Sequence, residues 1–212
     1  IVVFSPYCLL RPTTNRIFDM RLCDSFAGHN VPVTIVYPYA YMKGNISAGK
    51  IPQSYGLQHT VSTRMLLTPL RETSSKYTFL FWMMIGFGFS TIRLFFSSLF
   101  SSRQTILFSR DPKLLVPALW LKKYLGRLFR VKVIFMAAEV KDTRLYKKVV
   151  RETDGVFAGV STTRDAIRKI ADVPEEKFIL SLTPVPVYTN DPSKTEARKI
   201  IQYDSERPLI VY

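Results

Sequence analysis

The alternation of short apolar runs with amphipathic segments is the feature that most constrains how this chain folds. It opens with an apolar run at Ile1–Ser5, an amphipathic segment at Asn15–Ala27 and a second apolar run at Val31–Tyr37. A strand, a helix and a strand in this order form a right-handed crossover between parallel strands. We therefore predict a Rossmann-like, doubly wound α/β fold with a mainly parallel sheet of six or more strands.

The first predicted helix has a clear division of apolar and polar positions. Its apolar side chains recur at helical spacing, which predicts a buried face made of Ile17, Met20, Cys23, Phe26 and Ala27. The polar side chains opposite, which predict a solvent face, are Arg16, Asp19 and Asp24. Gly28 follows them and is expected to end the helix.

The second half of the chain repeats the alternation with sharper boundaries. The predicted strands are Thr105–Ser109, Val131–Met136, Gly155–Val160 and Lys177–Leu182. The predicted helices are one that Asp111 and Pro112 begin and Gly126 ends, a charged and exposed one at Thr143–Glu152, and one capped by Thr162 with Asp165 completing an approximate capping box. This order supports the parallel sheet.

Two segments of the first half stand apart. Residues 38–58 show no clear periodicity and predict a long loop, ahead of a short strand at Thr60–Leu66. Residues 78–100 are the most apolar stretch, with 16 uncharged residues between Lys76 and Arg93. A bilayer span needs about 20. We predict a core or interfacial helix with aromatic rings near the surface, and a spanning helix stays an alternative.

The chain is strongly basic, with 30 Lys and Arg against 16 Asp and Glu. A net charge of +14 favours anionic partners such as sugar phosphates or lipid headgroups. The basic residues are scattered and no nucleic-acid motif is present, so no nucleic-acid partner is predicted. Cys8 and Cys23 lack metal or redox spacing and are predicted to be reduced core residues. These features favour a cytoplasmic protein, with a peripheral position at the inner membrane face left open.

The two ends of the chain suggest how it is divided into domains. Apolar runs begin at Ile1 and close at Tyr212, and a stable domain rarely starts and stops inside strands. Pro184 and Pro186 interrupt the alternation and predict a linker. We expect one domain over residues 1–187, and a linker with the first strand of a second, truncated domain over 188–212.

Four motifs, in this order and spacing, carry a family resemblance. They are Gly28-His29 before the strand at 31–36, Tyr55-Gly56-Leu57, the segments 109–112 and 133–139, and the segments 153–161 and 173–179. Together they resemble the N-terminal, acceptor-side domain of GT-B glycosyltransferases of the retaining family-4 type. The resemblance implies a second domain, which binds the sugar nucleotide and lies beyond Tyr212.

The resemblance also implies an activity. It implies transfer of a hexosyl or other glycosyl group from a sugar nucleotide to a glycan or lipid-linked acceptor, with no metal and no cofactor. The 212 residues alone are expected to be inactive, because the leaving diphosphate is held by the other domain. Two alternatives remain: a membrane-associated, catalytically degenerate binding domain, and a GT-B sugar-nucleotide epimerase.

The candidate site residues follow the predicted strands, since ligands of open parallel sheets bind beyond the strands' carboxyl ends. They are Arg11, Thr13 and Thr14 after the first strand, then Arg110, Glu139 and Ser161. Ala138 stands where the family carries its histidine, and Glu139 matches the acidic, catalytic partner. A solvated loop is the alternative for the first group and a turn for Ser161. His29 and His59 have no partner at motif spacing and are predicted to be structural.

Overall fold

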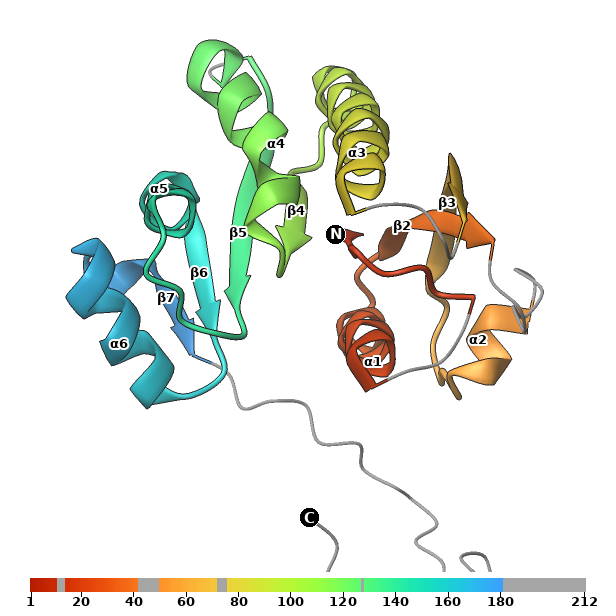
Figure 1. Ribbon diagram of the computed structural model, residues 1–212, viewed down its shortest axis with the longest axis horizontal. Coiled ribbons are helices and arrows are strands. Elements are labelled where there is room, and N and C mark those ends of the chain that lie inside the picture. The colour runs from red at the N-terminus through yellow and green to blue at the C-terminus, as the bar shows by residue number, and fades with distance from the viewer. Residues whose placement is uncertain (11–13, 42–49, 72–75, 127, 181–212) are drawn as a thin grey trace, which may run out of the picture.

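The computed structural model describes residues 1–10, 14–41, 50–71, 76–126 and 128–180. They form a sheet of seven strands, all parallel, in the order β3-β2-β1-β4-β5-β6-β7 (Figure 1). The strands are β1 Val2–Phe4, β2 Thr34–Tyr41, β3 Ser62–Arg71, β4 Thr105–Ser109, β5 Val131–Ala137, β6 Gly155–Ala158 and β7 Phe178–Leu180. This confirms the predicted Rossmann-like α/β fold.

Helices cover both faces of the sheet. The helices are α1 Thr14–Gly28, α2 Ile51–Ser54, α3 Lys76–Leu99, α4 Pro112–Leu125, α5 Arg144–Glu152 and α6 Ser161–Ala171, with a 3-10 turn at Glu175–Lys177. One core cluster joins α1 and α2 to the sheet, and a second joins α3 through α6 to it. Figure 1 shows α1 on the opposite side of the sheet from α3 and α4.

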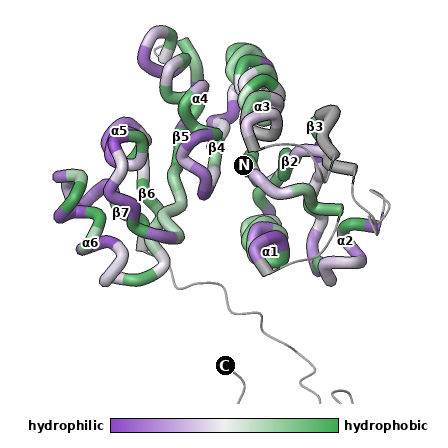
Figure 2. Tube along the Cα trace, in the orientation of Figure 1, coloured by the Kyte–Doolittle hydropathy of each residue, from purple (hydrophilic) through white to green (hydrophobic). Residues whose placement is uncertain are grey.

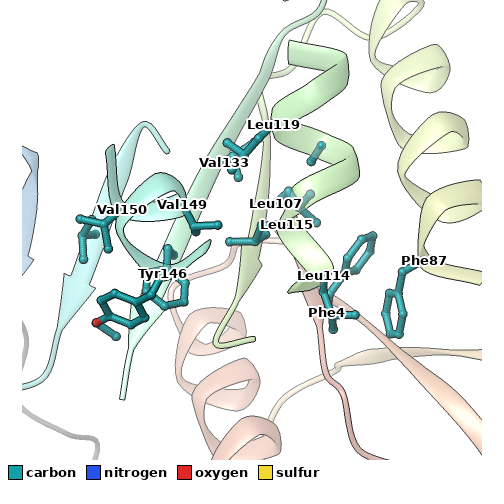
Figure 3. Close-up of a cluster of buried hydrophobic side chains, with 14 of the residues drawn as sticks. Phe4, Phe87, Leu107, Leu114, Leu115, Leu119, Val133, Tyr146, Val149 and Val150 are labelled. Atoms are coloured by element: carbon teal, nitrogen blue, oxygen red, sulfur yellow. The ribbon is translucent and has the colours of Figure 1, made fainter. Parts of the chain in front are cut away.

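The larger core lies beneath α3, α4 and α5. Leu107 and Val133 of the central strands are fully buried against Leu115 of α4 (Figure 3). Phe87 of α3 reaches β1, where its ring lies 4.9 Å from that of Phe4. Because side chains from three helices interlock with both central strands, the carboxyl ends of β1, β4 and β5 have a fixed relative position.

The two faces of α1 differ from the sequence prediction. Met20 and Cys23 are buried as predicted, but Ile17 is exposed, and Asp19 and Asp24 are buried rather than solvated. The reason is that each carboxylate finds tertiary partners, which offset part of the cost of burying a charge. The prediction was wrong here because those partners come from distant segments.

Asp24 shows what such a partner set does. Its carboxylate accepts hydrogen bonds from the backbone amides of Gln58 and His59, and the His59 ring lies 3.3 Å away. A Cβ at Gly28 would lie 3.0 Å from that ring, so glycine lets it pack over the helix end. His59 therefore ties the segment before β3 to α1, a structural role.

Three other predicted elements need correction. Residues 38–58 are not one loop, because β2 continues through Tyr41 and α2 follows at Ile51–Ser54. The helix α5 is not simply exposed, since it buries Tyr146, Val149 and Val150. The helix α6 begins at Ser161 with Val160 as its N-cap, so Thr162 lies inside the first turn and is not the cap.

Other predictions can be placed directly. Cys8 and Cys23 are buried in the core around α1, as predicted for core residues. Asp111 caps α4 by accepting a hydrogen bond from the amide of Lys113, at 2.9 Å. The predicted linker and the second-domain strand, residues 188–212, lie outside the described residues, as do Pro184 and Pro186.

Candidate functional site

A pocket of about 350 Å³ opens at the carboxyl edge of the sheet, where β1, β4 and β5 end. From β1 the chain turns to β2 through α1 on one face, and from β4 it turns to β5 through α4 on the other. Because the two connections diverge, a crevice remains between them, which is the usual ligand site of open parallel sheets. We call it the carboxyl-edge pocket.

The walls of the pocket come from three loops and one helix. Its lining comprises Pro6 and Tyr7 after β1, residues 110–113 after β4, Ala138, Glu139 and Lys141 after β5, Phe135 of β5, and Thr143, Leu145 and Tyr146 around the start of α5. Cationic, anionic, hydroxyl and aromatic side chains therefore face a common space. Such a mixture suits a ligand with both polar groups and apolar faces.

Arg110 is the cation that the fold holds most firmly. Its guanidinium lies 3.4 Å from the carboxylate of Asp19, and its side chain is only 19% exposed. The same guanidinium lies over the rings of Tyr7, at 5.9 Å, and Phe18, at 5.4 Å. Contacts with one carboxylate and two rings restrict its rotamers, so a ligand group meets a cation that is already oriented.

Asp19 is in turn held by the end of β1. The hydroxyl of Ser5 donates a 2.6 Å hydrogen bond to its carboxylate. Burial raises the pKa of Asp19, while the Ser5 hydrogen bond and the Arg110 charge partly counter that rise. The ionised carboxylate therefore depends on Arg110, and a variant that removes the guanidinium leaves a buried acid without its countercharge.

The ends of β1 and β4 are also joined directly. The hydroxyl of Ser109 donates a 2.8 Å hydrogen bond to the carbonyl of Phe4, and the amide of Asp111 donates to the same hydroxyl at 3.2 Å. Since Ser109 is fully buried, these bonds are shielded from water. They set the angle at which the loop carrying Arg110 leaves the sheet.

The loop after β5 forms the open rim of the pocket. Glu139 is exposed and lies 3.0 Å from the ammonium of Lys141, which is also exposed. An ion pair at that exposure contributes little to stability, so both side chains can reorient toward a ligand. Ala138 lines the pocket beside them, and it offers no group able to transfer a proton.

Tyr146 is one of the lining residues, and the described residues leave its buried hydroxyl group without a hydrogen-bond partner. The residue is 2% exposed, and its ring packs edge-on against Phe135 at 5.3 Å. Burial raises the pKa of Tyr146 to about 12, so the phenol is neutral at physiological pH. Figure 3 shows its oxygen pointing away from the aliphatic cluster. A buried hydroxyl of this kind is a candidate contact for a ligand.

No protein-family model matches this chain, and a search of the curated proteins finds no match. The functional proposal therefore rests on the motif resemblance and on the geometry of the pocket. In the described part of the chain, no group of three or more His, Cys, Asp or Glu side chains gathers in a way that could hold a metal ion.

The residues predicted from the sequence fall into three groups. Arg110 and Glu139 line the pocket together, with Ala138 beside Glu139 on the loop after β5. Ser161 is exposed at the first turn of α6 and is not among the lining residues. Thr14 begins α1, whereas Arg11 and Thr13 lie outside the described residues. The expected grouping of Arg110, Glu139 and Ser161 at one pocket thus holds for the first two.

Sequence reasoning missed several residues that shape the pocket. Asp19 was assigned to the solvent face, although it lies next to Met20 and four residues before Cys23, at the edge of the buried stripe. That spacing was a usable signal. Nothing in the sequence indicated that Tyr146 would present an unpaired hydroxyl, because this depends on which segments surround it.

Proposed function

We propose that this domain is the acceptor-side half of a retaining GT-B glycosyltransferase of the family-4 type, and that the carboxyl-edge pocket holds the acceptor. The observation that supports this most directly is the pocket itself, at the switch point of a doubly wound sheet. It is lined by the restrained cation Arg110, by the exposed carboxylate Glu139 and by Tyr146, whose buried hydroxyl has no partner among the described residues.

The chemistry of a sugar acceptor fits these groups. Sugar hydroxyls both donate and accept hydrogen bonds, so they pair with a carboxylate, a phenol and a guanidinium alike. The apolar C–H face of a sugar ring packs on an aromatic ring such as that of Tyr7, which lines the pocket and is partly exposed. Where the sugar carries a phosphate, Arg110 and Lys141 supply countercharge.

The proposed mechanism relies on positioning and electrostatics. In the family the resemblance names, a histidine lies near the reacting sugar, and Ala138 stands at that place. Transfer would therefore depend on orienting the acceptor hydroxyl against the anomeric carbon, with Glu139 as a pocket group able to accept a hydrogen bond from it. The leaving nucleoside diphosphate would be stabilised by the partner domain that the resemblance implies.

The test uses the protein expressed from its complete reading frame. It is incubated with radiolabelled UDP-, GDP- and ADP-sugars and a panel of glycan and lipid-linked acceptors, and the labelled product is separated by chromatography. We expect transfer from one nucleotide class, reduced about 100-fold or more in R110Q because a preorganised charged contact is lost. The matched control is K169Q, which removes an exposed cation from α6.

The outcomes separate the proposal from its rivals. Conversion of the sugar nucleotide without transfer would favour the epimerase. No turnover with any nucleotide would refute glycosyl transfer. Transfer that R110Q leaves unchanged would refute the role of the pocket while preserving the activity.

A further inference from the structure

The outer side of α3 carries an exposed aromatic and aliphatic stripe along its whole length. We call it the α3 stripe, and its members are Tyr77, Phe81, Phe89, Ile92 and Phe96 on the helix and Phe100 directly after its last residue. Phe89 is 70% exposed and Phe100 is 90% exposed. Apart from one interval of eight positions between Phe81 and Phe89, the residues recur three or four positions apart, which is the spacing of one helical face. Figure 2 shows α3 as a mostly hydrophobic helix, whereas α5 is largely hydrophilic.

The stripe continues onto the segment after α4. The ring of Phe129 packs edge-on against Phe95 at 5.1 Å and Phe96 at 6.3 Å, which places this segment beside the end of α3. Its neighbour Leu128 is 65% exposed. Arg130 donates a 3.0 Å hydrogen bond to the carbonyl of Ser102, so its cation is held at the same end.

The charge around the stripe has one sign. Between residues 73 and 138 the sequence has ten Lys and Arg but a single acidic residue, Asp111. The side chains of Arg93, Arg103, Lys123 and Arg130 are exposed in this part of the structure. Asp111 lies at the carboxyl-edge pocket, where it caps α4, so it does not offset the cations along α3. Exposed rings and a uniform positive charge therefore coincide.

We propose that this face binds an anionic lipid bilayer, with α3 lying in the plane of the membrane interface. Exposed rings would enter the boundary between headgroups and acyl chains while the surrounding cations contact lipid phosphates. A second copy of the chain is a poorer occupant, because it would bring like charges together. An acidic protein partner is the other outcome that the experiment resolves. The inference does not depend on the proposed glycosyl transfer.

The same helix also meets the length and composition of a membrane span, over Phe81–Leu99, of which a third is buried in the structure. However, Met83, Phe87 and Phe95 on its other side are buried in the core. To span a bilayer, α3 would have to leave the sheet and expose that core. Binding in the interface plane keeps both sides of the helix in a suitable environment.

The experiment measures co-sedimentation of the 212-residue chain with vesicles of phosphatidylcholine alone or with 30% phosphatidylglycerol, at low and at high salt. We expect binding to the anionic vesicles only, weakened by salt because the lipid charge is screened. The variant F89S/F100S should bind about ten-fold less tightly. R93Q/R103Q should lose about five-fold for each charge removed.

Matched controls place the same changes elsewhere. I17S/V31S removes exposed apolar side chains near α1 on the other face, and K50Q/K169Q removes two exposed cations far from α3. Both should bind like the parent, and circular dichroism should show all four variants folded. The proposal would be overturned if the controls lost as much vesicle affinity as the test variants, if no binding occurred at low salt, or if neutral vesicles were bound as well as anionic ones. Bound protein that alkaline carbonate fails to extract would indicate a spanning helix and would also overturn the proposal. Binding to an acidic protein but not to vesicles would overturn it as well.

Discussion

Tyr146→Phe tests whether the pocket hydroxyl serves a ligand rather than the fold. The substitution removes one oxygen atom and keeps the ring that packs on Phe135. Burying a hydroxyl without a partner costs about 1–3 kcal/mol, and Tyr146 is 2% exposed. We therefore expect the free energy of unfolding to rise by about 1 kcal/mol. This is the lower end of that range, because the substitution leaves a small void where the oxygen was. For a chain of this size that corresponds to a rise in Tm of about 2–4 °C.

The matched control is Tyr55→Phe, which should have the opposite sign. Tyr55 is also buried, at 4% exposure, but its hydroxyl donates a 2.8 Å hydrogen bond to the carbonyl of Leu9. Removing that donor leaves a buried carbonyl short of a partner, so stability should fall by about 1 kcal/mol or more. Urea unfolding followed by fluorescence measures both variants under the same conditions.

The functional arm of the test is ligand binding. If the Tyr146 hydroxyl contacts a sugar or sugar phosphate, the phenylalanine variant should bind about 2–10-fold more weakly while being more stable. Saturation-transfer NMR with a panel of glycosides and sugar phosphates measures this. A loss of stability as large as that of Tyr55→Phe would show that the hydroxyl has a partner within the protein, and the reasoning would fail.

Three further outcomes are expected. Phe87→Ala should cost about 3–5 kcal/mol because the ring is fully buried, whereas Phe89→Ala, two residues along, should stay within about 0.5 kcal/mol; equal effects in thermal unfolding would contradict the packing of α3. Burial raises the pKa of Asp154, but hydrogen bonds from Lys122 and the Val133 amide outweigh this effect, so the net shift of the pKa is downward. The free energy of unfolding should therefore fall as the pH drops through the native pKa, and Asp154→Asn should make this fall at acid pH smaller. Burial raises the pKa of Asp19, so the pH dependence of its contribution to stability is reversed. That contribution is greatest at low pH and is lost as the pH rises through the native pKa, so the stability of Asp19→Asn relative to the parent should increase with pH.

The local pattern of the sequence was enough for the fold class. The apolar runs at β1, β2, β4 and β5 and the amphipathic segments between them predicted a parallel, doubly wound sheet, and the structure has one. This works because both faces of such a sheet are covered, so its strands read as continuous apolar runs. The cap at Asp111 was equally readable, since capping depends on near neighbours in the chain.

Elements whose state depends on distant contacts were predicted less well. The helix α5 has a highly charged sequence, yet Tyr146, Val149 and Val150 recur at helical spacing and are buried by the sheet. The N-cap of α6 lies two residues earlier than predicted, at Val160 instead of Thr162, and Val160 makes no side-chain capping hydrogen bond. The helical spacing of these α5 residues was a short-range signal that the prediction did not use, whereas no short-range signal gave the start of α6.

What the sequence alone determined about this protein is its architecture, its basic character and the strand ends at which Arg110 and Glu139 would lie. Only the tertiary structure decided the state of those groups. Asp19 and Ser5, distant from Arg110 in the chain, fix its guanidinium, and α5 brings Tyr146 to the same pocket. The physical reason is that strand and helix periodicity are local properties, whereas the burial and pairing of a polar group depend on which segments the fold brings together.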